Sequence, residues 1–346
     1  MSASYLALYA SGELSRRAEK LWALYAPCRL CPRDCLADRA KGEIGPCKAD
    51  DTLQIAAHLP HFGEEPPLTG TRGAGTIFFT NCHLTCAFCQ NFQISQVRLG
   101  KNYSVEDLAG MMLDLQAKGC HNIDLVSPTH YVPHIVAALL IAIPRGLALP
   151  LVYNSNGYES VEVLKLLDGI VDIYLPDCKY ASDEHSTRIS GVKDYASRVL
   201  PAIQEMHRQV GPLALDGDGV AVRGLIVRHL VMPGDLGDTH AVLKMLHAAF
   251  GPELHLSLMT EYVPAGRALK DAVLGRKLNP WEQAEAQESH RHFGFKNGWV
   301  QAPPEPGQHE LFMPDFSTPE AFPFNHPDNA EKLHAIRLKM AESVAD

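Results

Sequence analysis

Three closely spaced cysteines are the residues of this chain best suited to carry out chemistry. Cys82, Cys86 and Cys89 follow the spacing C-x3-C-x2-C, and the aromatic Phe88 precedes the last of them. Ferredoxin motifs close a four-iron–four-sulfur site with a fourth nearby cysteine. Here the next cysteine is Cys120, a helix and a turn away. The spacing therefore predicts a cluster with one iron left open to a further ligand.

A zinc site is the alternative interpretation of these thiols, with His83 or a distant cysteine as the fourth ligand. Zinc knuckles usually contain C-x2-C pairs, and no second pair follows Cys89. The position of the motif also favours iron and sulfur. Residues 76–79 form an apolar, β-rich run, so the cysteines begin at the C-terminal end of a strand, where (β/α) barrels place their catalytic groups.

A second set of cysteines lies near the N-terminus at the spacing C-x2-C-x3-C-x11-C. Because four thiolates complete a tetrahedral site, we expect Cys28, Cys31, Cys35 and Cys47 to bind a metal. Thiolates accept both zinc and iron–sulfur clusters. Two roles therefore stay open: a zinc ion that braces a small module, or an auxiliary cluster that relays electrons or anchors a substrate.

Composition limits the class of protein. The 346 residues are 46% hydrophobic and 21% charged, as in a soluble globular protein with one large domain and extensions. The net charge of −9 argues against a broad nucleic-acid-binding face, and the longest apolar run, residues 135–143, is too short to span a bilayer. Seven of the nine cysteines fall in the two sets, which favours metal binding in a reducing compartment and predicts a cytoplasmic protein.

Strand and helix patterns alternate in the middle of the chain. Strands are predicted at residues 76–80, 122–127, 149–154, 170–175, 221–231 and 254–260. Helices are predicted between them at residues 104–118, 133–143, 160–167, 195–210 and 239–250. Six strands that alternate with helices imply an α/β fold with a parallel sheet.

Three parts of the chain follow from this pattern. We expect an N-terminal helix and four-cysteine metal module in residues 1–72, a core in residues 73–265, and a C-terminal extension in residues 266–346. A linker rich in proline and glycine is expected at residues 58–75. The extension holds a predicted helix at 279–292, a short strand at 295–300 and a last helix at about 328–343.

The extension is rich in proline between residues 301 and 328, and four phenylalanines are spread along that segment. We interpret these rings, Phe312, Phe316, Phe322 and Phe324, as anchors of an arm that docks on the core, because long proline-rich segments have no core of their own. A lid or a partner-binding strap is the alternative.

The three-cysteine motif resembles the cluster loop of the radical S-adenosylmethionine (SAM) superfamily. Three further stretches and the four-cysteine start resemble the branch described as pyruvate formate-lyase activating enzyme-like. The stretches are His-Phe-Gly-Glu-Glu-Pro-Pro at 61–67, Gly-Thr-Ile-Phe-Phe-Thr at 75–80 and Cys-Gln-Asn-Phe-Gln-Ile-Ser at 89–95. The resemblance extends to about residue 300 and implies a partial (β/α)6 open barrel.

This resemblance implies a reaction. A reduced 4Fe-4S cluster would pass one electron to SAM, which chelates the open iron, and methionine and a 5′-deoxyadenosyl radical would form. That radical would remove a hydrogen atom from an unreactive carbon. A flavodoxin or ferredoxin-type protein would supply the electron. The target is either a glycyl radical enzyme or a small molecule or peptide held in the barrel, and a non-catalytic electron-transfer protein is the remaining alternative.

The resemblance also implies the residues that bind SAM, with Phe88 packed near its adenine. Many relatives receive the amino group of SAM on a Gly-Gly-Glu motif, whereas this chain has Ser-Pro-Thr-His at residues 127–130. Thr129 and His130 occupy that place, with a structural role as the alternative for His130. The polar turn of Asn154, Ser155 and Asn156 is expected near SAM. Arg228 is expected to hold the SAM carboxylate, because its fork binds both oxygens.

Residues after the fourth predicted strand are the catalytic candidates. Asp177 and Lys179 resemble an Asp-x-Lys segment of activating enzymes, with a surface ion pair as the alternative. Cys178 between them is expected either to pack in the core or to donate a hydrogen atom to a substrate radical. Glu64 and Glu65 are interpreted as part of an exposed turn, with a paired-carboxylate site near the cluster loop as the alternative.

Overall fold

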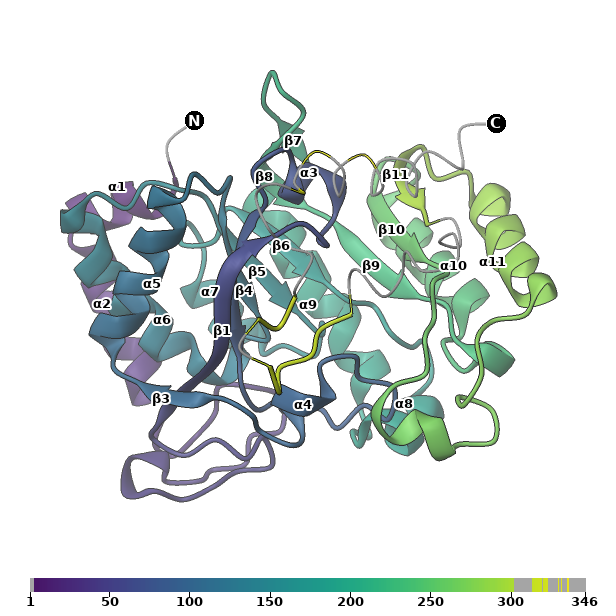
Figure 1. The fold of residues 1–346 in the computed structure, drawn as a ribbon, viewed down its shortest axis with the longest axis horizontal. Helices are drawn as coiled ribbons and strands as arrows, with labels where there is room; N and C mark the ends of the chain where they lie inside the picture. The colour runs from purple at the N-terminus through teal and green to yellow at the C-terminus, as the bar shows by residue number, and fades with distance from the viewer. Residues whose placement is uncertain are drawn as a thin grey trace.

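The computed structural model describes residues 3–301, 313–318, 320–322, 329, 331 and 335. Its strands are β1 (Leu53–His61), β2 (Ala74–Phe79), β3 (Lys101–Tyr103), β4 (Ile123–Val126), β5 (Leu151–Ser155), β6 (Ile173–Pro176), β7 (Ala214–Leu215), β8 (Ala221–Leu225), β9 (Val227–Leu230), β10 (His255–Met259) and β11 (Asn297–Val300). They form one sheet in the order β3-β1-β2-β4-β5-β6-β8-β7 and a second in the order β11-β10-β9 (Figure 1).

The predicted parallel α/β core is confirmed. Strands β2, β4, β5, β6 and β8 pair in parallel in chain order, and β9, β10 and β11 do the same. The single strand expected at residues 221–231 is in fact shared between the sheets, since β8 pairs with β6 and β9 pairs with β10. A bridge between Asp177 and Arg228 joins the two sheets at the end of β6. This sequential order places the C-terminal ends of the strands along one edge.

Helices flank the sheets. They are α1 (Tyr5–Ala10), α2 (Glu13–Ala23), α3 (Pro66–Thr69), α4 (Phe92–Ser95), α5 (Val105–Ala117), α6 (Val132–Ala142), α7 (Val161–Leu166), α8 (Asp183–Ser190), α9 (Tyr195–Val210), α10 (Thr239–Phe250) and α11 (Pro280–Phe293). The predicted helices between the strands are all present within a few residues. Helix α5 begins with a capping box in which Ser104 and Asp107 bond each other's backbone. Helices α1, α2, α5 and α6 lie together on the left of Figure 1.

Strand β1 is the main addition to the predicted fold. It pairs antiparallel with β2, so that His61 at its end lies opposite Ala74 at the start of β2. A linker was expected over residues 58–75. Instead, the strand places residues 62–65 at the N-terminal end of β2, whereas the cysteines follow its C-terminal end. Helix α3 then begins with two prolines in its first turn.

The described part of the C-terminal extension docks on the core as predicted. Phe316 and Phe322 contact Phe78 of β2, with ring centroids 5.3 Å from it in both cases. Phe312, Phe324 and nearly all of the last predicted helix lie outside the described residues. No helix among the described residues has the length and apolar character needed to cross a membrane.

Candidate active site

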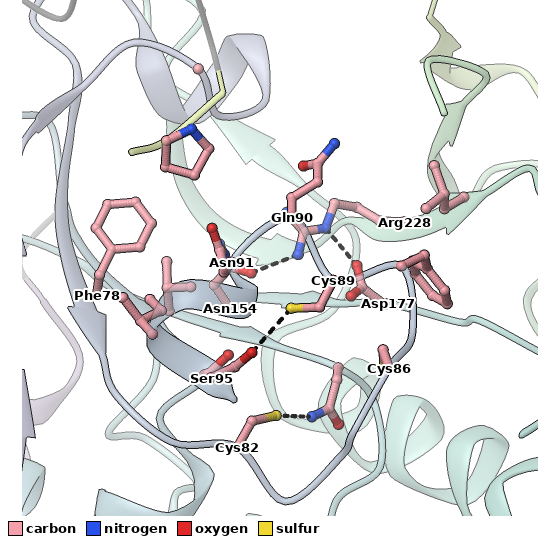
Figure 2. A pocket seen from close by; sticks show the side chains of 18 of the residues that line it. Phe78, Cys82, Cys86, Cys89, Gln90, Asn91, Ser95, Asn154, Asp177 and Arg228 are labelled. Atoms are coloured by element: carbon pink, nitrogen blue, oxygen red, sulfur yellow. Dashed lines mark hydrogen bonds and ion pairs between the residues drawn. The ribbon is translucent and has the colours of Figure 1, made fainter. Parts of the chain in front are cut away.

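The three-cysteine loop opens onto a cavity of about 270 Å³ at the C-terminal end of β2. Cys82, Cys86 and Cys89 all line it. Figure 2 shows their side chains around the same space as Asn154, Asp177 and Arg228. The cysteines thus follow the end of a strand, as predicted, and the fold brings the predicted polar residues opposite them.

Each of the three thiols has a polar partner. The Asn156 amide donates to the Cys82 sulfur at 3.6 Å, and the Ser190 hydroxyl donates to the Cys86 sulfur at 2.9 Å. The Cys89 sulfur lies 3.3 Å from the Ser95 hydroxyl. Hydrogen-bond donors around a sulfur stabilise thiolates and tune a metal bound to them.

Burial and mutual repulsion oppose ionisation of these thiols when no metal is present. Burial, together with the nearby Cys86, raises the pKa of Cys82 to about 12 and that of Cys89 to about 11. A cationic metal centre removes that penalty, because thiolates are the form that binds metal. Among the residues described, no three His, Cys, Asp or Glu side chains converge as they would on a single metal ion. Three thiols that line one cavity fit the three protein ligands of a 4Fe-4S cluster with one open iron.

The expected Asp177–Lys179 pair lies inside the cavity, not on the surface. The Lys179 ammonium is 2.5 Å from the Asp177 carboxylate, and it lies 5.7 Å from the centre of the Phe88 ring. Burial alone would raise the pKa of Asp177, but Arg228 and Lys179 outweigh it and hold that pKa below its usual value. Asp177 is therefore ionised at neutral pH and orients both cations.

Arg228 links the polar turn to Asp177. Its Nε donates to Asp177 at 2.9 Å, and its Nη2 donates to the Asn154 side-chain oxygen at 2.7 Å. Figure 2 shows both bonds as dashed lines. Asn154 in turn donates to Glu64 at 3.2 Å. The predicted arginine is thus in the cavity, with two of its donors already used by the protein.

Glu64 and Glu65 correct one interpretation of the sequence. They are not an exposed turn: both are buried, with 8% and 2% of their surface accessible, and both line the cavity. Glu65 accepts a hydrogen bond from Ser257 of β10 at 2.9 Å. The signal that could have found them is the apolar alternation of residues 53–59, which marks a strand leading directly to the two glutamates.

The polar turn after β5 is held by a tyrosine. Asn154, Ser155 and Asn156 all line the cavity. The Tyr195 hydroxyl lies 2.8 Å from the Asn156 carbonyl and 3.0 Å from the Asp177 carbonyl. It therefore joins this turn to the turn after β6 that contains Asp177. Gly157 follows with φ +75°, and a Cβ there would collide with the Asp177 carbonyl. Only glycine fits this close approach of the two turns.

The Ser-Pro-Thr-His segment places only its first residue at the cavity. Ser127 lines it, with φ +58°. Thr129 and His130, expected at the SAM amino group, do not line it. Thr129 donates to Glu159 at 2.7 Å, and the His130 ring lies 2.8 Å from the Thr80 carbonyl. The side chains of Thr129 and His130 are therefore bonded within the fold, which supports the structural role for His130.

Cys178 lies in the core. It is fully buried among the side chains of the main hydrophobic cluster and does not line the cavity, although both of its neighbours do. This position fits a packing role and not hydrogen-atom donation to a substrate in the cavity. Cys120 is also buried in the same cluster.

The N-terminal cysteines lie together next to the cluster loop. The Sγ atoms of both Cys35 and Cys47 lie within 4 Å of where a Cβ on Gly45 would be. Between Cys31 and Cys35, Arg33 donates to the His83 carbonyl at 2.6 Å, one residue after Cys82. The four thiols do not converge on one ion in the described structure, so metal binding there stays a prediction.

Comparison with known proteins agrees with this site. A family model for the radical SAM superfamily matches residues 76–217, which include the three cluster-loop cysteines and the Asp177–Lys179 pair. The chain is also similar to the uncharacterized protein MJ0674 of Methanocaldococcus jannaschii, with 30% identity over 275 residues that cover 77% of this chain and 74% of that protein. From the motif, the parallel fold and these matches together, the chain belongs to the radical SAM superfamily.

Proposed function

We propose that this protein reductively cleaves SAM and removes a hydrogen atom from a substrate held in the cavity. The observation that supports this most strongly is that three thiols, and no fourth cysteine among the described residues, line one cavity together with charged side chains. When bound, a 4Fe-4S cluster and SAM supply a 5′-deoxyadenosyl radical as the hydrogen-abstracting species. Cys82, Cys86 and Cys89 would hold the cluster.

Lys179 is the residue best placed to hold the SAM carboxylate. It lies close enough to Cys86 that this thiol contributes to its pKa, so it would lie near a cluster held by the three thiols. Burial lowers the pKa of Lys179, but Asp177 and Cys86 more than offset that effect and leave it raised. The ammonium therefore stays charged. Arg228, which the resemblance assigns to this role, already donates to Asp177 and Asn154.

The remaining cavity residues orient the cofactor and exclude water. Asn156 and Ser155 offer amide and hydroxyl groups to a ribose, and Phe88 offers an apolar face near an adenine. Met313, Pro314 and Phe322 of the C-terminal extension line the same cavity and cover it from one side. A covered cavity keeps a reactive radical from solvent.

The charges in the cavity favour a small molecule as substrate over a glycyl radical enzyme. The target carbon of a glycyl radical enzyme lies in a backbone loop and carries no charge of its own. Glu64 and Glu65 are buried and line the cavity together with the partly buried Arg228, where a charged small molecule would meet them. Activation of a glycyl radical enzyme is the second candidate, and the likeness of residues 177–179 to an Asp-x-Lys segment supports it.

The decisive experiment is anaerobic reconstitution with iron and sulfide, followed by reduction, addition of SAM and chromatographic detection of 5′-deoxyadenosine. We expect 5′-deoxyadenosine from the wild type and none from Cys86→Ala. A SAM-unresponsive cluster without this product would indicate an electron carrier. A doublet of a glycyl radical on a partner protein would favour activation.

Two further expectations are tested with the same sample. Iron, sulfide and zinc contents decide whether the N-terminal cysteines hold zinc, a second cluster or neither. Reduction by a flavodoxin or a ferredoxin, compared with dithionite, tests the proposed electron donor, and a cytoplasmic location stays a prediction.

A further inference from the structure

A buried serine at the end of α8 lies against one of the three thiols of the cluster loop. The Ser190 hydroxyl donates to the Cys86 sulfur at 2.9 Å, and none of the surface of Ser190 is accessible. Ser190 does not line the cavity. It is therefore out of reach of SAM or a substrate held there, and any part that it takes in the reaction passes through Cys86.

The partners of the other two thiols have different surroundings. Ser95 and Asn156 both line the cavity. Their sulfur contacts are longer, at 3.3 Å to Cys89 and 3.6 Å to Cys82. A ligand in the cavity can draw both of these side chains into hydrogen bonds of its own. The bond from Ser190 is the shortest of the three and is shielded from such competition.

A tyrosine fixes the direction of the Ser190 hydroxyl. The Tyr180 hydroxyl lies 2.7 Å from the Ser190 oxygen, and Tyr180 is also fully buried and outside the cavity. A serine hydroxyl has one hydrogen to donate and two lone pairs that accept. Because a thiolate only accepts, the Ser190 hydrogen goes to Cys86 and the Tyr180 hydrogen goes to the Ser190 oxygen. The two hydroxyls thus form a chain in which each bond polarises the next.

The backbone of α8 holds this serine in register with the cluster loop. The Thr85 amide donates to the Ser190 carbonyl at 3.0 Å, and the Ala87 amide donates to the Ile189 carbonyl at 2.9 Å. These two bonds lie on either side of Cys86 and involve no side chain. Removal of the Ser190 hydroxyl should therefore leave the loop in place and change only the environment of the sulfur.

A hydrogen bond to a ligating sulfur changes the reduction potential of an iron–sulfur cluster. Reduction adds negative charge, part of which resides on the sulfurs, and a donor stabilises that charge. The effect is larger in a buried site of low dielectric constant than in water. A cluster with such a bond is therefore easier to reduce, and its potential is less negative.

We propose that Ser190, held by Tyr180, raises the reduction potential of the cluster at the three-cysteine loop. This inference rests on the proposed function, because it needs a cluster on these thiols. Both residues are positioning residues and not catalytic ones, since they act through Cys86. The cysteine motif does not contain them: Tyr180 follows β6, and Ser190 is the last residue of α8.

A redox titration of the reconstituted full-length protein without SAM, followed by electron paramagnetic resonance, measures this potential. The signal that is missing in Cys86→Ala identifies the cluster at the loop. For Ser190→Ala we expect a lower potential, with a ratio of reduced to oxidised cluster about tenfold smaller at a given applied potential, which is about 59 mV for one electron. Tyr180→Phe leaves the Ser190 hydroxyl free to rotate and should lower the ratio by less.

Ser186→Ala is the matched control. Ser186 is a fully buried serine of the same helix, and its hydroxyl donates to the Val192 carbonyl at 2.9 Å instead of to a sulfur. This variant should lose a buried hydrogen bond and retain the wild-type potential. Electron–nuclear double resonance on protein reconstituted in light and heavy water is a direct readout of the bond. Ser190→Ala should lack one of the exchangeable proton couplings that the wild type shows.

Two results would overturn the inference: an unchanged potential in Ser190→Ala, or an equal fall in Ser190→Ala and Ser186→Ala, which would assign the effect to a loosened helix. Formation of 5′-deoxyadenosine by the wild type is measured on the same preparation. If this product forms while the potential of Ser190→Ala is unchanged, the inference fails and the proposed function stands. If the potential falls as expected and the wild type forms no 5′-deoxyadenosine, the reverse holds. A wild type without a cluster at the loop would overturn both.

Discussion

The two cysteine sets of this protein are built into different surroundings. Cys82, Cys86 and Cys89 face a cavity that also contains the ammonium of Lys179. The N-terminal set belongs to a module that protein groups already hold in place, chiefly the fully buried Arg39. Its guanidinium donates to the Asp50 carbonyl at 2.8 and 3.0 Å and to the His130 carbonyl at 2.7 Å. We therefore expect the same thiol chemistry to serve a reactive centre in one place and a packed support in the other.

The largest difference between the two sets is expected when one cysteine is removed from each in turn. Cys86→Ala should abolish 5′-deoxyadenosine formation and the absorbance of the cluster at this loop, because two thiolates cannot hold a cluster with one open iron. Cys31→Ala should retain 5′-deoxyadenosine formation if the N-terminal set is a support. Cys120→Ala, a buried cysteine outside both sets, is the control. Complete loss of the product in Cys31→Ala would show that the N-terminal set takes part in the reaction.

A large loss of stability is expected when the support loses Arg39. Arg39→Met removes a buried charged donor from two backbone carbonyls, and hydrogen bonds to charged groups contribute about 1.5–3 kcal/mol each. We expect the free energy of unfolding in urea to fall by about 3 kcal/mol. Arg39→Lys keeps the charge but loses the fork and should be intermediate. An unchanged midpoint in Arg39→Met would mean that the module is held by other contacts, a bound metal among them.

The pH dependence of the free energy of unfolding is a second test of the same region. Burial, together with the charge of Arg39, lowers the pKa of His134 to about 4. The unfolded chain protonates this ring near pH 6.5, whereas the folded chain does not until about pH 4. Stability from this group is therefore lost as the pH falls from about 6.5 to about 4, at about 1.4 kcal/mol per pH unit.

The measurement is the unfolding free energy of wild type and His134→Phe between pH 4 and 8. The ring of His134 packs edge-on against Trp22 and Tyr25, and phenylalanine can occupy the same place without titrating. In this pH window, the free energy of unfolding should change less steeply with pH in the variant. The difference in slope should be at most that of one bound proton, about 1.4 kcal/mol per pH unit. Identical slopes would mean that His134 is already protonated in the folded protein.

The smallest effect is expected at the contact between the two sets. Arg33→Ala removes the bond to the His83 carbonyl and a second one to the Gly191 carbonyl at 2.9 Å. We expect stability to fall by about 1 kcal/mol and amide exchange in the cluster loop to rise, with 5′-deoxyadenosine formation reduced but present. Hydrogen exchange measured by mass spectrometry is the readout, and Arg29→Ala, an exposed arginine of the same module, is the control. Equal exchange in the two variants would show that Arg33 does not position the loop.

The sequence predicted the repeating part of the fold because its signals are local. Apolar runs marked β2, β4, β5, β6 and β10, and caps and glycines marked the helices between them. The long strand expected at residues 221–231 could not be divided from the sequence alone. Its break at Ile226 follows from a change of pairing partner, since the Ile226 amide bonds Tyr174 of β6 while β9 pairs with β10.

Within the site, the residues that follow strands were predicted and those brought in by long-range pairing were not. Asn154, Asp177 and Lys179 each lie at or just past the end of a strand, and all three line the cavity. Glu64 and Glu65 depend on the antiparallel pairing of β1 with β2, which no local pattern specifies. Thr129 and His130 were placed by analogy with a motif that this chain lacks, and in the structure their side chains bond within the fold.

The described part of the C-terminal extension has a consequence for the order in which the site is completed. The amide of Gln93, four residues past Cys89, donates to the Asp315 carboxylate at 2.9 Å and accepts from the Phe316 amide at 2.8 Å. These contacts bring Met313, Pro314 and Phe322 to the cavity wall. The ribosome synthesises this wall after all the described strands, so those strands can fold while the cavity is still open on that side. Completion of the cavity wall thus waits for residues 313–322, which follow every described strand in the chain.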